Sequence, residues 1–230
     1  MGFIYLIRHG QTRWNKEEIF RGQYDIPLDD FGRKQALAVA EELKTRKLEK
    51  PIFLSSPLQR ASETAILASS FLDEKEDKFS NYKKTSSTTG AQIYTENAFN
   101  DINFGEWQGK SRALVESSYP ELYQKWIVEP DSVSFPGGGN LRETSIKALE
   151  AFYTAAKKYA EYDLVIVSHR VITKALLCML LGCSLNVFRR IQQNTACINL
   201  LEWDGASFNF LLLNDTCHLR YLQEKNNYDL

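Results

Sequence analysis

The chain has 230 residues, of which 43% are hydrophobic, and this is enough to bury the core of one large domain. Its 28 basic and 29 acidic side chains leave a net charge of −1, which excludes the broad positive field of a protein that binds nucleic acid or an anionic membrane. The apolar start, Phe3 to Ile7, is too short for a signal peptide or a membrane span. The four cysteines lack CxxC spacing, so we expect buried free thiols rather than disulfides or a zinc site. We therefore expect a cytoplasmic protein whose positive charge is confined to a pocket.

The first third of the chain is expected to alternate strands with helices. Phe3 to Ile7 predicts a buried strand, and the residues that follow, through Asn15, predict a polar loop. Asp29-Asp30-Phe31-Gly32 indicates a helix entry with a carboxylate placed as cap, and the helix continues to about Lys47. Pro51 to Leu54 predicts a second strand, and a helix from Leu58 to about Leu72 follows it. Strand, helix, strand, helix in this order is typical of a parallel sheet.

The stretch from Asp73 to Gly90 interrupts this alternation. It is rich in Lys, Asp, Glu, Ser and Thr and poor in apolar residues, which predicts a polar surface insertion. Two interpretations are compatible with its composition: a plain solvated loop, or a basic flap over a site. After it, Ile93 to Phe99 is expected to be extended, and Ser111 to Val128 to form two short helices joined near Pro120.

The second half of the chain predicts the rest of the sheet and its covering helices. Asn140 is placed to cap a helix to about Tyr162, and Leu164 to Val167 predicts a buried strand followed by a helix to Leu181. Asp204-Gly205 is a strong hairpin signal between two apolar segments, so an antiparallel pair is expected at one edge. The predicted fold class is α/β: a three-layer sandwich with a mostly parallel central sheet, one antiparallel edge and helices on both faces. We expect one domain over residues 1–230, with the insertion at about 73–90.

Two of the three histidines directly follow predicted buried strands, in Ile7-Arg8-His9 and Val167-Ser168-His169. In a parallel sheet both would emerge at the same edge, where ligands bind, and face each other across a cleft. Arg8 is a fixed cation beside His9, which is nucleophilic when neutral, and Gly10 lets the backbone approach a ligand closely. This pattern predicts phosphate binding and transfer through histidine. His218 lacks such a context and is expected to be structural.

Four motifs in this order resemble those of one known family. They are Arg8-His9-Gly10-Gln11-Thr12 with Asn15, Ser55-Ser56-Pro57-Leu58-Gln59-Arg60-Ala61, Phe104-Gly105-Glu106-Trp107-Gln108-Gly109, and Val167-Ser168-His169. Together they resemble the histidine phosphatase superfamily, also called phosphoglycerate-mutase-like, and within it the phosphatase branch. The resemblance covers nearly the whole chain except the insertion.

The resemblance implies a role for each matching residue. His9 would be the nucleophile that forms a phosphohistidine, with its other ring nitrogen donating to a fixed acceptor that sets the tautomer. The phosphoryl oxygens would be held by Arg8, Arg60 and His169. The substrate pocket would be lined by Thr12, Asn15, Arg21 and Gly22. The resemblance implies neither a metal nor a cofactor.

Asp101 and Arg170 are among the residues that depart from the family pattern. The general acid is commonly a glutamate three residues before the Phe-Gly pair, and here that position holds Asp101, with Glu106 as the rival. Relatives commonly have glycine directly after the second histidine, and here Arg170 follows it. Arg170 either contacts the substrate at the pocket mouth or packs away from it.

The function expected from these residues is a metal-independent phosphomonoesterase acting on a small phosphorylated metabolite. A phosphoglycerate mutase that depends on 2,3-bisphosphoglycerate is the alternative within the family, although the spacing from Trp107 to Pro136 resembles the phosphatases. A catalytically silent phosphate-binding module is the alternative from a different class. A protein phosphatase that docks its partner through residues 73–90 is the third. The expected partner is a small phosphate ester, and edge strands of such sheets allow a homodimer.

Overall fold

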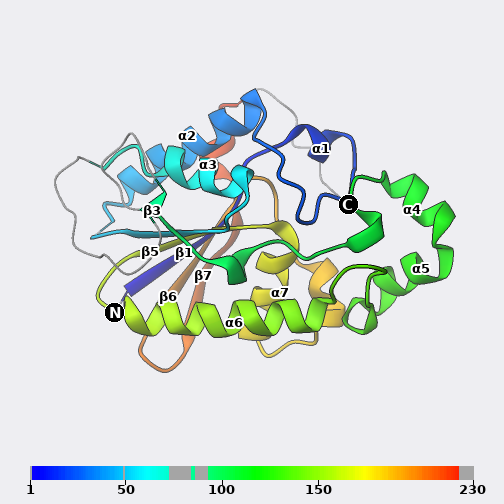
Figure 1. Ribbon diagram of the computed structural model, residues 1–230. Coiled ribbons are helices and arrows are strands. Elements are labelled where there is room, and N and C mark those ends of the chain that lie inside the picture. Colours follow the sequence, from blue (N-terminus) through cyan, green and yellow to red (C-terminus); the bar gives the residue numbers. More distant parts are fainter. Residues whose placement is uncertain (1, 49, 73–83, 86–92, 223–230) are drawn as a thin grey trace.

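The computed structural model describes residues 2–48, 50–72, 84–85 and 93–222, and these form an α/β sandwich (Figure 1). Within this part of the chain, seven strands form one sheet. Their spatial order is β3 (Lys84–Thr85), β4 (Ile93–Thr95), β2 (Ile52–Ser55), β5 (Leu164–Ser168), β1 (Gly2–Arg8), β6 (Ile198–Trp203) and β7 (Phe208–Asp215). No helix among the described residues is long and apolar enough to cross a membrane.

The strand directions confirm the predicted fold class. The pairs β4–β2, β2–β5 and β5–β1 are parallel, and β6 and β7 add an antiparallel edge next to β1. The predicted hairpin at Asp204-Gly205 joins these last two strands. At the opposite edge, β3 pairs antiparallel with β4.

Helices cover both faces of the sheet (Figure 1). One face carries α2 (Asp30–Thr45) and α3 (Gln59–Ala68), and the other carries α6 (Leu141–Lys158) and α7 (Arg170–Leu180). The remaining elements are short: α1 (Arg13–Lys16), α4 (Arg112–Ser118), α5 (Pro120–Val128), and the 3-10 helices η1 (Asn97–Phe99), η2 (Gly105–Trp107), η3 (Pro130–Ser132), η4 (Leu185–Arg190) and η5 (Cys217–Leu219). Of these, α4 and α5 lie beyond the end of the sheet, to the right in Figure 1.

Side-chain caps begin the long helices where the sequence predicts them. Asp29 Oδ1 accepts a hydrogen bond from Gly32 N at 2.7 Å, and Asn140 Oδ1 accepts one from Glu143 N at 2.8 Å. The predicted polar loop through Asn15 is wrong at its end, because the short helix α1 forms there. Asn15 Oδ1 accepts from Thr12 N at 2.9 Å, and this bond satisfies a backbone donor at the start of the helix.

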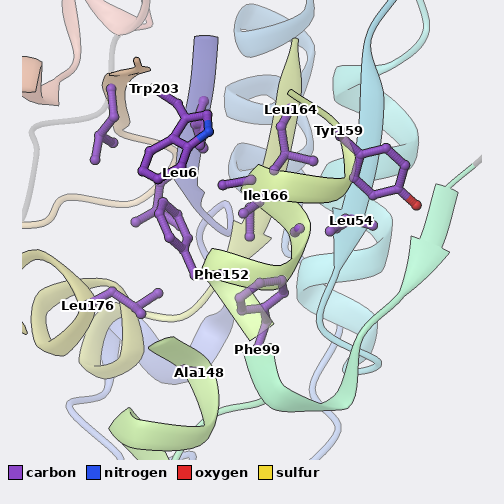
Figure 2. Packing of buried hydrophobic residues seen from close by; sticks show 14 of the residues in the cluster. Leu6, Leu54, Phe99, Ala148, Phe152, Tyr159, Leu164, Ile166, Leu176 and Trp203 are labelled. Atoms are coloured by element: carbon purple, nitrogen blue, oxygen red, sulfur yellow. The ribbon is translucent and has the colours of Figure 1, made fainter. Parts of the chain in front are cut away.

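Alternating strand residues build a core on each side of the sheet. Leu6, Leu54 and Ile166 point toward α6 and α7 and pack with Phe152 and Leu176, as Figure 2 shows. On the other face, the residues in between pack against α2 and α3; examples are Ile7, Phe53 and Val167.

A third, aromatic cluster lies beyond the sheet and joins α4, α5 and η4 to α7. Trp107, Trp126 and Phe135 are buried in it, and the Phe104 and Phe135 rings have centroids 4.9 Å apart in an edge-to-face arrangement. This cluster forms the base on which the outer part of the site rests.

The described cysteines are free, but only Cys178 and Cys197 are buried, so the expectation of four buried thiols is wrong for Cys183 and Cys217. Cys183 follows the end of α7, and Cys217 opens the 3-10 helix η5 near the C-terminal end of the described chain.

The predicted insertion at 73–90 lies outside the described residues apart from Lys84–Thr85, so its role stays a prediction, as does the single domain.

Candidate active site

The parallel pairing of β1 with β5 brings two histidines together. Arg8 lies opposite Ser168 in the strand register, so His9 and His169 follow at the same edge of the sheet. His9 N donates to the Ser168 carbonyl at 3.0 Å, and the two imidazole centroids are 5.3 Å apart. The expectation that the two histidines emerge at the same edge of the sheet is confirmed.

The tautomer of His9 is set by its own backbone neighbour. His9 is 1% exposed, and its Nδ1 lies 2.6 Å from the Gly10 carbonyl oxygen. Because a carbonyl can only accept, Nδ1 carries the proton and Nε2 keeps a lone pair. Burial, followed by the charges of Arg60 and His169, lowers the pKa of His9 well below 6.5. His9 is therefore neutral at neutral pH, with Nε2 ready to act as a nucleophile.

Two buried arginines are anchored by backbone carbonyls. Arg60 is fully buried; its guanidinium donates to Tyr24 O at 2.8 Å and to Gly22 O at 2.7 Å. Arg8 Nη1 donates to Gln193 O at 2.7 Å. Burial lowers the pKa of Arg60, but guanidinium groups remain protonated in proteins. The result is two fixed positive charges beside His9.

The two candidate acids lie in different surroundings. Asp101 is buried, lines the same pocket as His9, and has Oδ2 3.4 Å from Arg60 Nη2. Burial raises the pKa of the Asp101 carboxyl above 3.8, although Arg60 and Arg21 act to lower it. Glu106 is exposed, does not line the pocket, and accepts a hydrogen bond from the Tyr119 hydroxyl at 2.7 Å. The geometry favours Asp101.

Ser56 is a site residue to which the sequence assigned no role. Its Oγ lies 2.7 Å from His169 Nε2, and His169 Nδ1 is buried with no hydrogen-bond partner among the described residues. When the serine hydroxyl donates to Nε2, the proton of His169 resides on Nδ1, which can then donate to a bound anion. The sequence did offer a signal for this role, because Ser56 places a hydroxyl group directly after strand β2.

The structure divides the remaining predicted binding residues into two groups. Arg21 and Arg170 lie on the pocket wall together with His9, so Arg170 does not pack away from the pocket. Thr12, Asn15 and Gly22 do not line it. Thr12 Oγ1 donates to Asn15 Oδ1 at 2.8 Å, and Gly22, at φ +50°, supplies a carbonyl to Arg60. Arg8, Arg60 and His169 are not lining residues either, so the lining does not decide binding, and the binding role of Thr12, Asn15 and Gly22 stays a prediction.

The pocket has a volume of about 240 Å³ and extends outward from His9 over the aromatic cluster. Its aromatic lining consists of Phe20, Phe104, Tyr123, Trp126 and Phe188. Beyond the predicted residues, it is lined by three cationic side chains that sequence reasoning missed: Arg112, Lys174 and Arg189. Among the described residues, no three His, Cys, Asp or Glu side chains gather as metal ligands.

Comparison with known proteins places this site in a family. The model of the histidine phosphatase superfamily, branch 1, matches residues 4–78 and 82–216. The chain belongs to that superfamily. It is a phosphoric monoester hydrolase of the family, and the family and enzyme class expected from the motifs are confirmed.

Relatives of this phosphatase match it over nearly its full length. Phosphoserine phosphatase 1 of Hydrogenobacter thermophilus is 28% identical, over 94% of this chain and 93% of that protein. The metal-independent phosphoserine phosphatase of Arabidopsis thaliana is 27% identical, over 92% and 76%. The fold matches that of Bacillus stearothermophilus YhfR, with a TM-score of 0.82 and 23% identity over 95% of this chain and 100% of the other.

Proposed function

We propose that this phosphatase is a metal-independent phosphomonoesterase that hydrolyses a small phosphorylated metabolite through a phosphohistidine on His9. The observation that carries the proposal is the 2.6 Å hydrogen bond from His9 Nδ1 to the Gly10 carbonyl. It holds the imidazole in the tautomer whose Nε2 has a free lone pair, and burial keeps that ring neutral.

In the first step, the His9 Nε2 lone pair attacks phosphorus and the bond from phosphorus to the ester oxygen breaks. Asp101, protonated, gives its proton to the leaving oxygen, so an alcohol departs. The raised pKa of Asp101 suits this role. The charge that spreads over the three equatorial oxygens is stabilised by Arg8, Arg60 and Nδ1–H of His169.

In the second step, water attacks the phosphorus of the phosphohistidine. The Asp101 carboxylate now accepts a proton from that water, the P–N bond breaks, and its electron pair returns to His9 Nε2. Inorganic phosphate leaves, and Asp101 is protonated again for the next cycle. One carboxyl group thus serves both steps.

The size of the pocket supports a small substrate, since about 240 Å³ is below the usual range of ligand sites. The two relatives described above are named phosphoserine phosphatases, and one of them is named metal-independent, which supports hydrolysis of a small ester without a metal. A cytoplasmic location and a homodimer stay predictions.

Hydrolysis of 4-nitrophenyl phosphate in excess EDTA, by wild type and His9→Ala, tests the proposal. We expect wild-type turnover to persist and His9→Ala to lose about 10⁴-fold or more of kcat. His218→Gln is the matched control, because this histidine is hydrogen-bonded to the Ala196 carbonyl and does not line the pocket. Loss of wild-type activity in EDTA, or full activity in His9→Ala, would contradict the proposal.

The same proteins separate the alternatives. A mutase would interconvert phosphoglycerates with 2,3-bisphosphoglycerate and release little inorganic phosphate. A silent module would bind phosphate and turn over no ester. Either outcome would contradict the phosphomonoesterase proposal, the first in favour of the mutase and the second in favour of the silent module.

A further inference from the structure

The outer end of the pocket contains cations that the hydrolysis described above does not use. Arg112, Lys174 and Arg189 all line the pocket, and they come from three separate elements, α4, α7 and η4. Of the described residues that line the pocket, five are cationic and two, Glu18 and Asp101, carry a carboxyl group. In a chain with a net charge of −1, this is a local concentration of positive charge.

Arg112 and Arg189 line the pocket together with Tyr123. Arg112 Nε donates to the Tyr123 hydroxyl at 2.8 Å. Burial lowers the pKa of Arg189, and both Tyr123 and Arg112 act on it electrostatically, Tyr123 raising it and Arg112 lowering it. Among the described residues, no carboxylate forms an ion pair with either guanidinium. Two like charges held together without a counter-charge make a site suited to an anion.

Lys174 extends this cationic wall toward the reacting centre. It is only 8% exposed, although it lies on the mostly apolar helix α7, and its Nζ lies 6.0 Å from the centroid of the Phe188 ring. It follows Arg170 by four residues, so the two share one face of the helix and are about 6 Å apart along its axis. Lys174 therefore lies on the pocket wall about one helical turn from Arg170.

We infer that the substrate carries a second anionic group, a carboxylate or another phosphate, which binds to Arg112, Lys174 and Arg189 while its phosphoryl group lies against His9. This inference rests on the proposed function, because it uses the same pocket. The aromatic lining strengthens the attraction by keeping water away from the charges.

A matched pair of esters tests this inference. 3-Phosphoglycerate and glycerol 3-phosphate differ only in a carboxylate that replaces a hydroxymethyl group. Measured by phosphate release, wild-type kcat/KM should favour the carboxylate by about ten-fold or more, since charge-assisted contacts at a partly desolvated site are strong. Fructose 1,6-bisphosphate against fructose 6-phosphate is the second pair, and a preference there alone would assign the second anion as a phosphate.

Arg189→Gln should reduce the observed preference by about ten-fold, because it removes one cation of the outer site. Arg190→Gln is the matched control: its side chain is the exposed neighbour on η4, does not line the pocket, and should leave the preference intact. Lys174→Met, which keeps the length of the side chain, should act in the same direction as Arg189→Gln.

Equal kcat/KM values within both pairs would overturn the inference, and so would a preference that Arg189→Gln leaves unchanged. Continued hydrolysis in either case would leave the proposed function standing. If wild type hydrolysed none of the four esters but still hydrolysed 4-nitrophenyl phosphate, the proposed function would stand. Calorimetric binding of 3-phosphoglycerate and glycerol 3-phosphate would then decide the inference, which requires tighter binding of 3-phosphoglycerate in wild type and loss of that difference in Arg189→Gln.

Discussion

The inner and outer ends of this pocket are built in different ways. At the inner end, the side chains are held by backbone carbonyls: His9 by Gly10, Arg60 by Gly22 and Tyr24, and Arg8 by Gln193. At the outer end, side chains hold side chains, as in the contact of Arg112 with Tyr123 or of Lys174 with Phe188.

This difference separates chemistry from specificity. A carbonyl contact depends on the course of the chain, so the strand ends that form the sheet also orient the reacting groups. At the outer end, by contrast, a contact between two side chains is lost whenever either residue is replaced. We infer that the inner end determines what reaction occurs and the outer end determines which ester enters.

The largest effect is expected when the general acid at the inner end is removed. Asp101→Asn should lower kcat for an alkyl phosphate by about 10²- to 10⁴-fold, because a poor leaving group needs a proton. The loss should be smaller with 4-nitrophenyl phosphate, whose leaving group departs without one. Steady-state kinetics on both esters is the measurement.

Glu106→Gln is the control for this prediction, because Glu106 is exposed and binds Tyr119 outside the pocket. We expect it to change kcat by less than about two-fold, as is usual for a surface change away from the chemistry. A large loss in Glu106→Gln together with an active Asp101→Asn would reverse the assignment of the acid.

A smaller effect is expected at Ser56, which positions His169. Ser56→Ala should lower kcat by about ten-fold with little change in KM, because a mispositioned group costs more in the transition state than in binding. Ser56→Thr, which keeps the hydroxyl, should restore activity, and Ser62→Ala, whose hydroxyl binds only a helix carbonyl, should be neutral. Equal activity in Ser56→Ala and wild type would show that the contact with His169 does not orient the ring.

The smallest effect concerns stability against pH. Burial lowers the pKa of His9 and His169 well below 6.5, so below pH 6.5 the unfolded chain binds protons that the folded chain does not. The free energy of unfolding should therefore fall as pH falls from 6.5 toward the folded pKa values. His169→Gln should flatten this decline in urea titrations between pH 7 and 5, and an unchanged slope would contradict the burial of a neutral His169.

His218→Gln is a useful comparison, because burial also lowers the pKa of His218, but less strongly. We expect it to flatten the decline less than His169→Gln does. Asp101 contributes in the opposite sense, since its raised pKa costs stability as pH rises above 3.8, but both variants keep it and the difference between them isolates the histidines.

Much of the inner end could be predicted from the sequence, for a physical reason. His9 and His169 each follow an apolar strand directly, and parallel pairing places such positions at one edge whatever the loops do. The position of Asp101 three residues before Phe104-Gly105 was similarly informative, and the structure places it on the pocket wall with His9.

The outer end could not be predicted in this way. Lys174 lies within an almost wholly apolar helix, where the pattern indicates only burial, and Arg189 and Arg112 are 77 residues apart in sequence. Their approach depends on how α4 and η4 pack on the aromatic cluster, and this packing has no signature in local periodicity. The short helix at Arg13–Lys16 was missed because it depends on one side-chain contact, that of Asn15 with Thr12.

Trapping the covalent intermediate tests the central claim most directly. Wild-type enzyme turning over an ester would be quenched in alkali, where phosphohistidine survives, and its peptides mapped by mass spectrometry. The account predicts one phosphate on the peptide that contains His9. It should be attached at Nε2, because Nδ1 is hydrogen-bonded to the Gly10 carbonyl. Rapid turnover with no phosphorylated peptide, or with phosphate on His169 instead, would contradict it.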